Sequence, residues 1–430
     1  MTRCIVLNIA RAAAVAATVA LAVASAALAQ TAEPPATSAS APQISSVPAP
    51  LRAAFQAELS GAVSDWARAT TPRDKFAAAY RRAGALAGLH RWISAHGWLR
   101  IAAQLAPDDA ARALVAQSYR ALRRKSPLRI DLAFRITPSS NVNNGSAHTH
   151  YLNWQLPNTD QALSGTTYGL YGQLGWRIAQ DRHRQRTLRL RAGASRVRLD
   201  SAPAGVDDAD YAQSHLGLSI VTQARPTPRL RTTTEIAVLR LWRAQTPFET
   251  RATWDWTSTR HLGPQTTGPS NTLGTGVSVR LATRPSGEGH SYVGAHVSGG
   301  WHTGVGPVHL RLGAARSLSD TAYLDYHELD ARVTWQPRLD ASPNAGADTK
   351  PDWQPSLTLG LTGRWHDDNI YTDTPRRDGR LSLRAATALP QWETYGFTPI
   401  VALTASRNRS NVAVYETEQM ALGITLQSAF

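Results

Sequence analysis

The chain has 430 residues, a formal net charge of +15 and 42% hydrophobic residues, yet its mean hydropathy is −0.30. Outside the N-terminus no stretch reaches the ~20 apolar residues that a membrane-spanning helix needs, which excludes a helical membrane protein. The single cysteine, Cys4, excludes a disulfide scaffold and a Cys-ligated zinc or iron–sulfur site.

Residues 1–29 have the features of a secretory signal peptide. Arg3 and Arg11 precede an apolar run over 12–23, and the small residues at 27–29 predict cleavage before Gln30. An uncleaved anchor is the alternative. Cleavage removes Cys4 and both arginines, which leaves a cysteine-free chain of charge +13. Because an exported chain does not meet nucleic acid, we expect no nucleic-acid partner despite the basic charge.

Two segments of different character follow the signal. Residues 30–50 are rich in Pro, Ala, Ser and Thr, a composition that predicts a disordered linker. Residues 51–125 are rich in alanine, leucine and arginine and predict helices, and the pattern over 79–109 resembles one tetratricopeptide unit. A single unit cannot bury its own apolar face, so we expect helices near 54–66 and 111–123 to cover it. This domain is either a peptide-binding platform or a helical spacer.

From Pro127 onwards the hydrophobic period changes from 3.6 to 2. In the first run, for example, Leu128, Ile130 and Leu132 alternate with Arg129 and Asp131, a pattern typical of strands with one apolar and one polar face. The alternation predicts fourteen strands, at about 127–137, 167–179, 187–199, 211–222, 229–242, 251–260, 271–283, 291–301, 306–316, 322–336, 355–366, 379–389, 396–406 and 415–430. An even number suits a bacterial single-chain barrel.

A soluble β-sandwich shows the same alternation, but aromatic residues favour a membrane barrel over 126–430. Tryptophans are expected near strand ends, where lipid-facing aromatic girdles lie. They are Trp176, Trp242, Trp254, Trp256, Trp301, Trp335 and Trp365. The final residue, Phe430, is in phase with the last apolar run, and we expect it to act as an assembly signal. The predicted fold is an all-β transmembrane barrel of about fourteen antiparallel strands, preceded by a small α-helical tetratricopeptide-like periplasmic domain.

Nine arginines share the polar phase of their strands and are therefore expected to face the lumen. They are Arg129, Arg135, Arg189, Arg191, Arg280, Arg311, Arg332, Arg364 and Arg384. One interpretation is a positive pore that favours acidic cargo. The other is a set of ion pairs across the lumen with carboxylates such as Asp131, Glu235, Glu328 and Asp330, and we prefer this second interpretation.

The sequence contains no phosphate-binding glycine loop, dinucleotide fingerprint or H-E-x-x-H motif. His148 and His150 are spaced like metal ligands, but they lie in a polar loop, where histidines are usually solvated. His290 and Ser291 are adjacent on a strand, so they point to opposite faces and do not form a base–nucleophile pair. We therefore expect no enzyme, cofactor or metal site.

Two segments resemble the surface lipoprotein assembly modifier (Slam) family. LAFRITPSSNVNNGS (132–146) is similar to that family's first strand and loop, and GFTPIVALTASRNRSNVAVY (396–415) with the following run is similar to its last hairpin. The marks of that hairpin are Pro399, the Arg407–Asn411 loop and Tyr415. The candidate functional residues of these two loops are Ser140, Asn141, Asn143, Ser410 and Asn411. The structural alternative is that these Asn and Ser side chains stabilise tight strand ends by bonding to the backbone.

The resemblance implies an outer-membrane translocator of a Gram-negative bacterium that moves surface lipoproteins or small secreted proteins, with its N-terminal domain in the periplasm. Its partners would be outer-membrane lipids, a protein cargo, the barrel-assembly machinery and periplasmic chaperones. The helical region is shorter than in the better-known members. The alternatives are a diffusion porin, in which the first loop would constrict an arginine-lined lumen, and an exopolysaccharide exporter, which normally has a much longer helical array.

Overall fold

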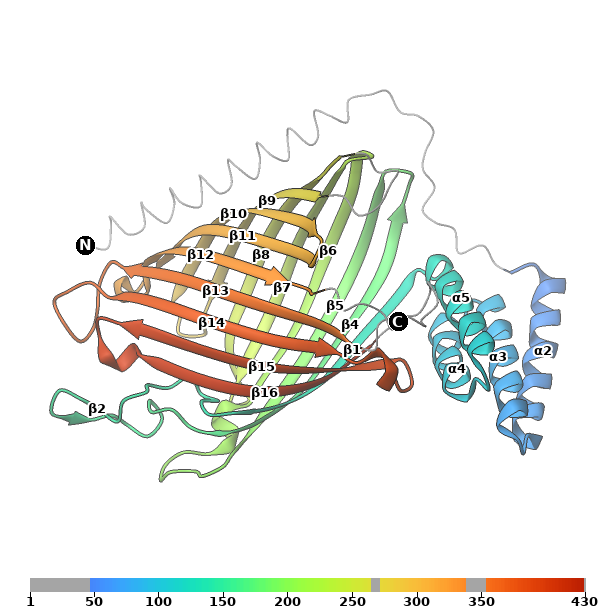
Figure 1. Ribbon diagram of the computed structural model, residues 1–430, viewed down its shortest axis with the longest axis horizontal. Helices are drawn as coiled ribbons and strands as arrows, with labels where there is room; N and C mark the ends of the chain where they lie inside the picture. Colours follow the sequence, from blue (N-terminus) through green and yellow to red (C-terminus); the bar gives the residue numbers. More distant parts are fainter. Residues whose placement is uncertain (1–46, 264–270, 338–352, 429–430) are drawn as a thin grey trace. The chain divides into compact units, whose positions relative to one another are not determined.

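A computed structural model describes residues 47–263, 271–337 and 353–428 (Figure 1). The expected signal peptide, most of the expected linker and the expected assembly signal Phe430 lie outside these residues. The linker prediction is wrong at its end, because Ala49 and Pro50 already belong to a helix, α2 (Ala49–Arg68). Proline fits the first helical turn, where the backbone N–H has no partner within the helix.

Four helices precede the strands in the described part of the chain. They are α2 (Ala49–Arg68), α3 (Pro72–Gly88), α4 (Trp92–Leu105) and α5 (Asp109–Lys125). The Thr71 hydroxyl accepts a hydrogen bond from Asp74 N at 3.1 Å and caps α3, and the Asp108 carboxylate accepts one from Ala111 N at 2.7 Å and caps α5. None of the described helices combines the length and the apolar character needed to cross a membrane.

The helices pack through small side chains. Ala79, Ala95 and Ala102 are fully buried, and Val115 and Tyr119 of α5 belong to the same core. Alanine lets helix axes approach closely, which suits a domain of four short helices. The α3–α4 pair covers the segment where one tetratricopeptide unit is expected, and α2 and α5 lie on the segments expected to flank it.

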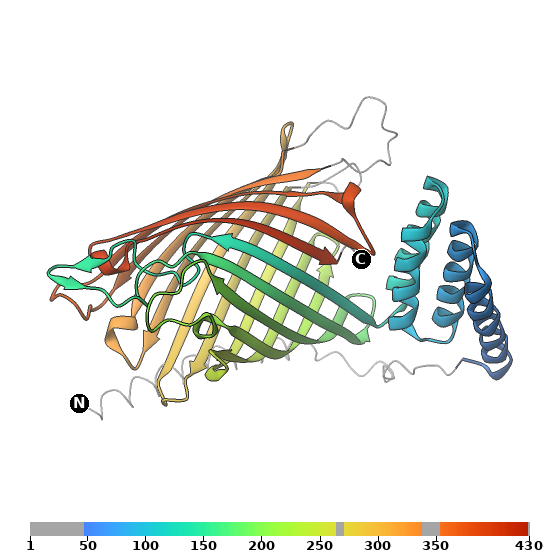
Figure 2. The same ribbon diagram turned by 90° about the horizontal axis from the view of Figure 1, so that it is seen from below.

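Fourteen antiparallel strands close into a barrel (Figures 1 and 2), which confirms the predicted fold class. Each strand pairs with the next along the chain, and the first pairs with the last. The strands are β1 (Leu128–Ser139), β4 (Gly165–Gln180), β5 (Arg184–Leu199), β6 (Gln213–Thr227), β7 (Leu230–Arg243), β8 (Thr246–Leu262), β9 (Asn271–Thr283), β10 (Gly289–Thr303), β11 (Gly306–Ser319), β12 (Tyr326–Trp335), β13 (Gln354–His366), β14 (Arg377–Ala388), β15 (Phe397–Ser410) and β16 (Thr417–Ser428).

The predicted strand boundaries are wrong in two respects. Three strands begin later than expected, because 3-10 turns occupy Asp208–Tyr211, Ala322–Leu324 and Ala413–Tyr415. β8 is longer than expected, at 17 residues, so Trp254 and Trp256 lie in its middle and not near a strand end. Their side chains still belong to the outer face, opposite residues such as Ile236 and Val279 of the neighbouring strands.

The outer face of the barrel is apolar. Large side chains are half exposed there on every side, for example Leu218 (51%), Ile236 (60%), Leu361 (52%) and Met420 (60%). Exposed apolar patches of this extent do not persist in water. In a closed barrel the backbone N–H and C=O groups of every strand are hydrogen-bonded to neighbouring strands, and the apolar outer belt suits contact with lipid. The barrel therefore spans a membrane.

The two ends of the barrel differ in their connections. One end carries residues 140–164, 200–212, 244–245, 284–288, 320–325, 367–376 and 411–416, and we call it the loop end. The first of these contains a hairpin of β2 (His150–Tyr151) and β3 (Trp154–Gln155). Figures 1 and 2 show this hairpin beyond the strand ends, and not within the barrel as a constricting loop would be.

Pro399 lies within β15, where a missing N–H would normally break the ladder. β14 ends opposite Ile400, and Pro399 O accepts a hydrogen bond from Leu389 N of the following turn at 2.9 Å. The proline therefore faces the side on which its neighbour has already ended, and the barrel tolerates it.

Candidate functional site

The inner face of the barrel carries the nine arginines singled out above. Residues that lie opposite each other on paired strands share a face, and the strand register places all nine arginines on the same face of the barrel. For example, Arg129 and Arg189 both lie opposite Gly175, and Arg311 lies opposite Arg332. The same register places Arg280 opposite Tyr292. The lumen wall is therefore rich in guanidinium groups.

Five of the nine arginines have carboxylate partners in the wall. The pairs are Arg129–Asp131 (2.9 Å), Arg189–Glu235 (3.4 Å), Arg191–Glu235 (2.7 Å), Arg311–Asp330 (3.6 Å) and Arg364–Glu328 (2.6 Å). All four carboxylates are among those expected to pair with the arginines. The expectation that the pairs cross the lumen is wrong, because each pair joins the same strand, adjacent strands or next-but-one strands of the wall. Glu235 contacts two guanidinium groups and is only 17% exposed, so its side chain links β5 to β7 across β6, the strand that pairs with both.

The other four arginines have no carboxylate within ion-pair distance among the described residues. Arg135 lies over the Tyr171 ring at 5.6 Å and Arg280 over the Tyr292 ring at 5.2 Å. Arg332 and Arg384 have neither a carboxylate nor an aromatic ring as a partner in the part of the chain that the structure describes. Positive charge in a channel wall bounded by lipid raises the local concentration of anions.

The first-loop motif residues hold the loop end together near the closing pair β1–β16. Asn141 is 1% exposed; its amide donates to Gly145 O at 2.9 Å and to Glu418 O at 3.1 Å, and it accepts from Gly145 N at 2.9 Å. Asn143 donates to Gln161 O at 2.7 Å and accepts from Leu163 N at 2.9 Å. These contacts are internal to the protein.

Ser140 also bonds across the closing pair β1–β16. Its hydroxyl accepts from Met420 N at 2.9 Å, and its own N–H donates to Met420 O at 2.9 Å. In the last loop, Asn411 donates to Pro375 O at 3.0 Å and accepts from Arg377 N at 2.7 Å. Ser410 accepts from Val412 N at 3.2 Å. All five motif residues thus bond to backbone, as the structural alternative proposes.

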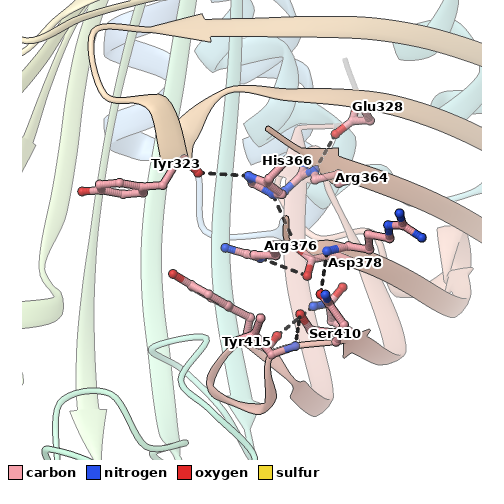
Figure 3. Close-up of polar contacts among 12 residues, drawn as sticks. Tyr323, Glu328, Arg364, His366, Arg376, Asp378, Ser410 and Tyr415 are labelled. Atoms are coloured by element: carbon pink, nitrogen blue, oxygen red, sulfur yellow. Dashed lines mark hydrogen bonds and ion pairs between the residues drawn. The ribbon is translucent and has the colours of Figure 1, made fainter. Parts of the chain in front are cut away.

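A buried polar cluster at the loop end is absent from the expectations drawn from sequence (Figure 3). His366 Nε2 lies 3.6 Å from the Asp378 carboxylate, and Nδ1 donates to Tyr323 O at 3.1 Å. Arg376 bonds to Asp378 at 2.5 Å and covers the Tyr415 ring at 3.4 Å. The cluster ties three loop-end connections to each other.

This cluster contains a serine, a histidine and an aspartate, yet it is not arranged for nucleophilic catalysis. Ser410 bonds to the Asp378 carboxylate. A catalytic serine must instead bond to the imidazole, which takes its proton. His366 and Asp378 are each about 5% exposed at the side chain, so substrate has no access to them. Only the register of β13 and β14 reveals the cluster, which is why the sequence did not.

The remaining sequence candidates are separate from one another. His148 Nε2 bonds to Glu416 at 2.8 Å, whereas His150 Nδ1 contacts Thr149 Oγ at 3.0 Å. The Glu416 carboxyl pKa is lowered, chiefly by the His148 bond. In the described ranges no three His, Cys, Asp or Glu side chains are grouped to hold a metal ion. His290 and Ser291 lie on opposite faces of β10.

No protein-family model matches the chain, and no curated protein matches it. Solved structures with similar strand arrangements are barrels. A bacterial polysaccharide outer membrane secretin has a TM-score of 0.37 at 8% identity, over 69% of this chain and 98% of its own. A BenF-like porin from Pseudomonas fluorescens Pf-5 has a TM-score of 0.37 at 10% identity, over 70% and 99%. OccAB3 of Acinetobacter baumannii has a TM-score of 0.38 at 10% identity, over 70% and 98%. We therefore infer function from the chain's own residues.

Proposed function

We propose that this chain is an outer-membrane translocator that moves surface lipoproteins or small secreted proteins from the periplasm to the cell surface or medium. The observation that carries the proposal is the fusion of a folded helical domain to the first barrel strand, through Ser126 and Pro127 alone. A pore for small solutes has no need of such a domain. A domain joined this closely to the first strand suits a cargo that must be engaged before it enters the pore.

The charges of the two parts suit the same class of cargo. Residues 47–127 contain thirteen lysines and arginines but five acidic residues. The lumen wall adds the arginines without carboxylate partners, such as Arg332 and Arg384. An acidic polypeptide would therefore meet favourable charge both on the helices and in the barrel. Exposed apolar side chains on the helices, including Leu51 (52%) and Ile93 (55%), offer contacts to an unfolded segment.

The resemblance of the first and last hairpins to the Slam family supports the same proposal. The motif residues in both hairpins bond within the loop end, so this resemblance concerns how the barrel is closed and built. It is the shared construction, together with the helical domain, that favours a translocator over the two alternatives.

An anion-conducting porin is the second candidate, and the observation in its favour is that Arg332 and Arg384 have no carboxylate partner among the described residues. An exopolysaccharide exporter is less well supported, because the described helices number only four where a long array is expected.

A surface and medium proteome tests the proposal. The strain lacking this chain is compared with its parent and with strains that carry the full chain or the barrel alone (residues 1–50 fused to 126–430). We expect one or two proteins to leave the surface or medium and accumulate in the periplasm, with rescue by the full chain. An unchanged protein inventory, with altered uptake of small anions, would establish the porin instead.

A further inference from the structure

The β2–β3 hairpin at the loop end presents two large apolar side chains to solvent. Leu152 is 81% exposed and Trp154 is 79% exposed, more than any other large apolar side chain in the described part of the chain. They lie in and beside the turn that joins the two strands. Figure 1 and Figure 2 show this hairpin past the strand ends.

Leu152 also occupies an unfavourable backbone conformation, with φ at +54°. Glycine and asparagine adopt this conformation readily, whereas a leucine is unusual there because its Cβ crowds the following carbonyl. Asn153, the next residue, would suit the position better. A strained and exposed leucine at a turn points to a use for its side chain outside the fold.

Neighbouring aromatic residues extend this surface. The Tyr151 ring contacts the Tyr371 ring edge-to-face at 5.4 Å, and Tyr371 contacts Tyr415 at 5.7 Å. Tyr371 is 40% exposed and Ile370, beside it, is 55% exposed. Tyr415 contacts Arg376 of the buried cluster, which fixes one end of this row of three tyrosines. Tyrosine and tryptophan side chains are enriched among the few residues that provide most of the binding energy at protein interfaces.

Acidic side chains surround the surface. Asp160, Asp368 and Asp373 are exposed and make no ion pair within the described residues. Burial raises the Tyr371 hydroxyl pKa, and the negative charge of Asp160 raises it further, which indicates that this carboxylate lies near the aromatic row. Across all seven loop-end connections there are twelve carboxylates and two arginines. The exposed apolar side chains therefore lie among carboxylates that make the electrostatic potential of the loop end negative.

We propose that Leu152, Trp154, Ile370 and Tyr371, with the acidic groups around them, form a docking surface for a basic polypeptide segment of another protein, one in which lysine or arginine alternates with apolar side chains. The apolar residues would bury the partner's apolar side chains, and the acidic rim would attract its cations. Lipid headgroups with a net negative charge, such as phosphatidylglycerol, would be repelled. The inference is independent of translocation, because binding needs no passage through the lumen.

Direct binding to the full chain in phosphatidylcholine nanodiscs tests the proposal. The probe is a short fluorescein-labelled peptide of alternating lysine and leucine, read by fluorescence anisotropy against empty nanodiscs. Its matched control replaces lysine by glutamate. The variants are Leu152→Gly with Trp154→Ser, which preserves the turn because glycine accepts a positive φ, and Asp368→Asn with Asp373→Asn. Val305→Ser, at an exposed turn of the opposite end (64% exposed), is the control variant.

The proposal predicts saturable binding of the lysine peptide. The affinity should be about tenfold weaker in the variant without Leu152 and Trp154 and about threefold weaker in the variant without Asp368 and Asp373. High salt should weaken binding more in the parent than in the variant without the two carboxylates. The Val305→Ser variant should bind like the parent. Equal affinity of the apolar variant and the parent, or no binding at all, would overturn the proposal. So would tighter binding of the glutamate peptide, or recruitment of phosphatidylglycerol vesicles in preference to the lysine peptide.

Discussion

Asn141 offers the sharpest test of what the first-loop motif does. Replacing it with alanine removes three hydrogen bonds and leaves Gly145 N, Gly145 O and Glu418 O without these partners. The side chain is 1% exposed, so water does not replace the amide without rearrangement. At about 1 kcal/mol for each buried group that loses its partner, the free energy of unfolding should fall by about 2–4 kcal/mol.

Asn141→Asp should be at least as harmful as Asn141→Ala. The carboxylate still accepts from Gly145 N, but it places negative charge against the two carbonyl oxygens that the amide now donates to. Asn153→Ala is the matched control, because Asn153 lies in the same loop and is exposed. Guanidinium unfolding in lipid vesicles measures the stability, and limited proteolysis of residues 140–164 reports whether the loop has opened.

A change of less than about 0.5 kcal/mol in the Asn141→Ala variant, no larger than for Asn153→Ala, would refute this assignment. If such a variant folded normally and yet lost export, the motif would act on cargo and not on the barrel. A destabilised variant that still exports at low temperature would support the structural role.

Three further predictions follow from the faces and charges described above. Leu361→Arg should destabilise the barrel in lipid by about 2–4 kcal/mol, since the side chain faces lipid, whereas Thr362→Arg on the inner face should be nearly neutral in the same unfolding assay. Arg332→Gln with Arg384→Gln should shift the reversal potential in planar bilayers towards lower anion selectivity; an unchanged potential would mean that these guanidinium groups do not face the ion path. In the helical domain, burial and two nearby arginines lower the pKa of His96 to about 4. A group with a lowered pKa is neutral when folded and protonated more easily when unfolded, so hydrogen-exchange protection of α4 should fall as pH drops from about 6.5 towards 4. A His96→Leu variant should lose that pH dependence.

Much of the barrel follows from local sequence, because a strand's two faces are fixed by alternation alone. Parity placed Arg189, Arg191 and Glu235 on one face, and their ion pairs need only that neighbouring strands pair in order. Strand ends were less predictable, as β8 shows, because polar residues such as Thr250 and Arg260 interrupt its apolar phase without ending the strand.

The loop-end contacts were beyond the reach of sequence. Asn141 bonds to Glu418, which lies 277 residues away, and His366 meets Asp378 only through the β13–β14 register. Such contacts depend on where two strand ends come together after the barrel has closed. Turn chemistry did indicate that Asn141 and Asn411 stabilise strand ends, but not which backbone groups they bond to.

Photo-crosslinking from the lumen tests most directly whether polypeptides pass through the barrel. Benzoyl-phenylalanine is placed at position 362, on the inner face, and at position 361, on the outer face of the same strand, in living cells. The proposed function predicts that irradiation yields adducts with one or two exported proteins from position 362 and none from position 361. Folded barrels that yield no polypeptide adduct at position 362, while still conducting anions, would contradict it.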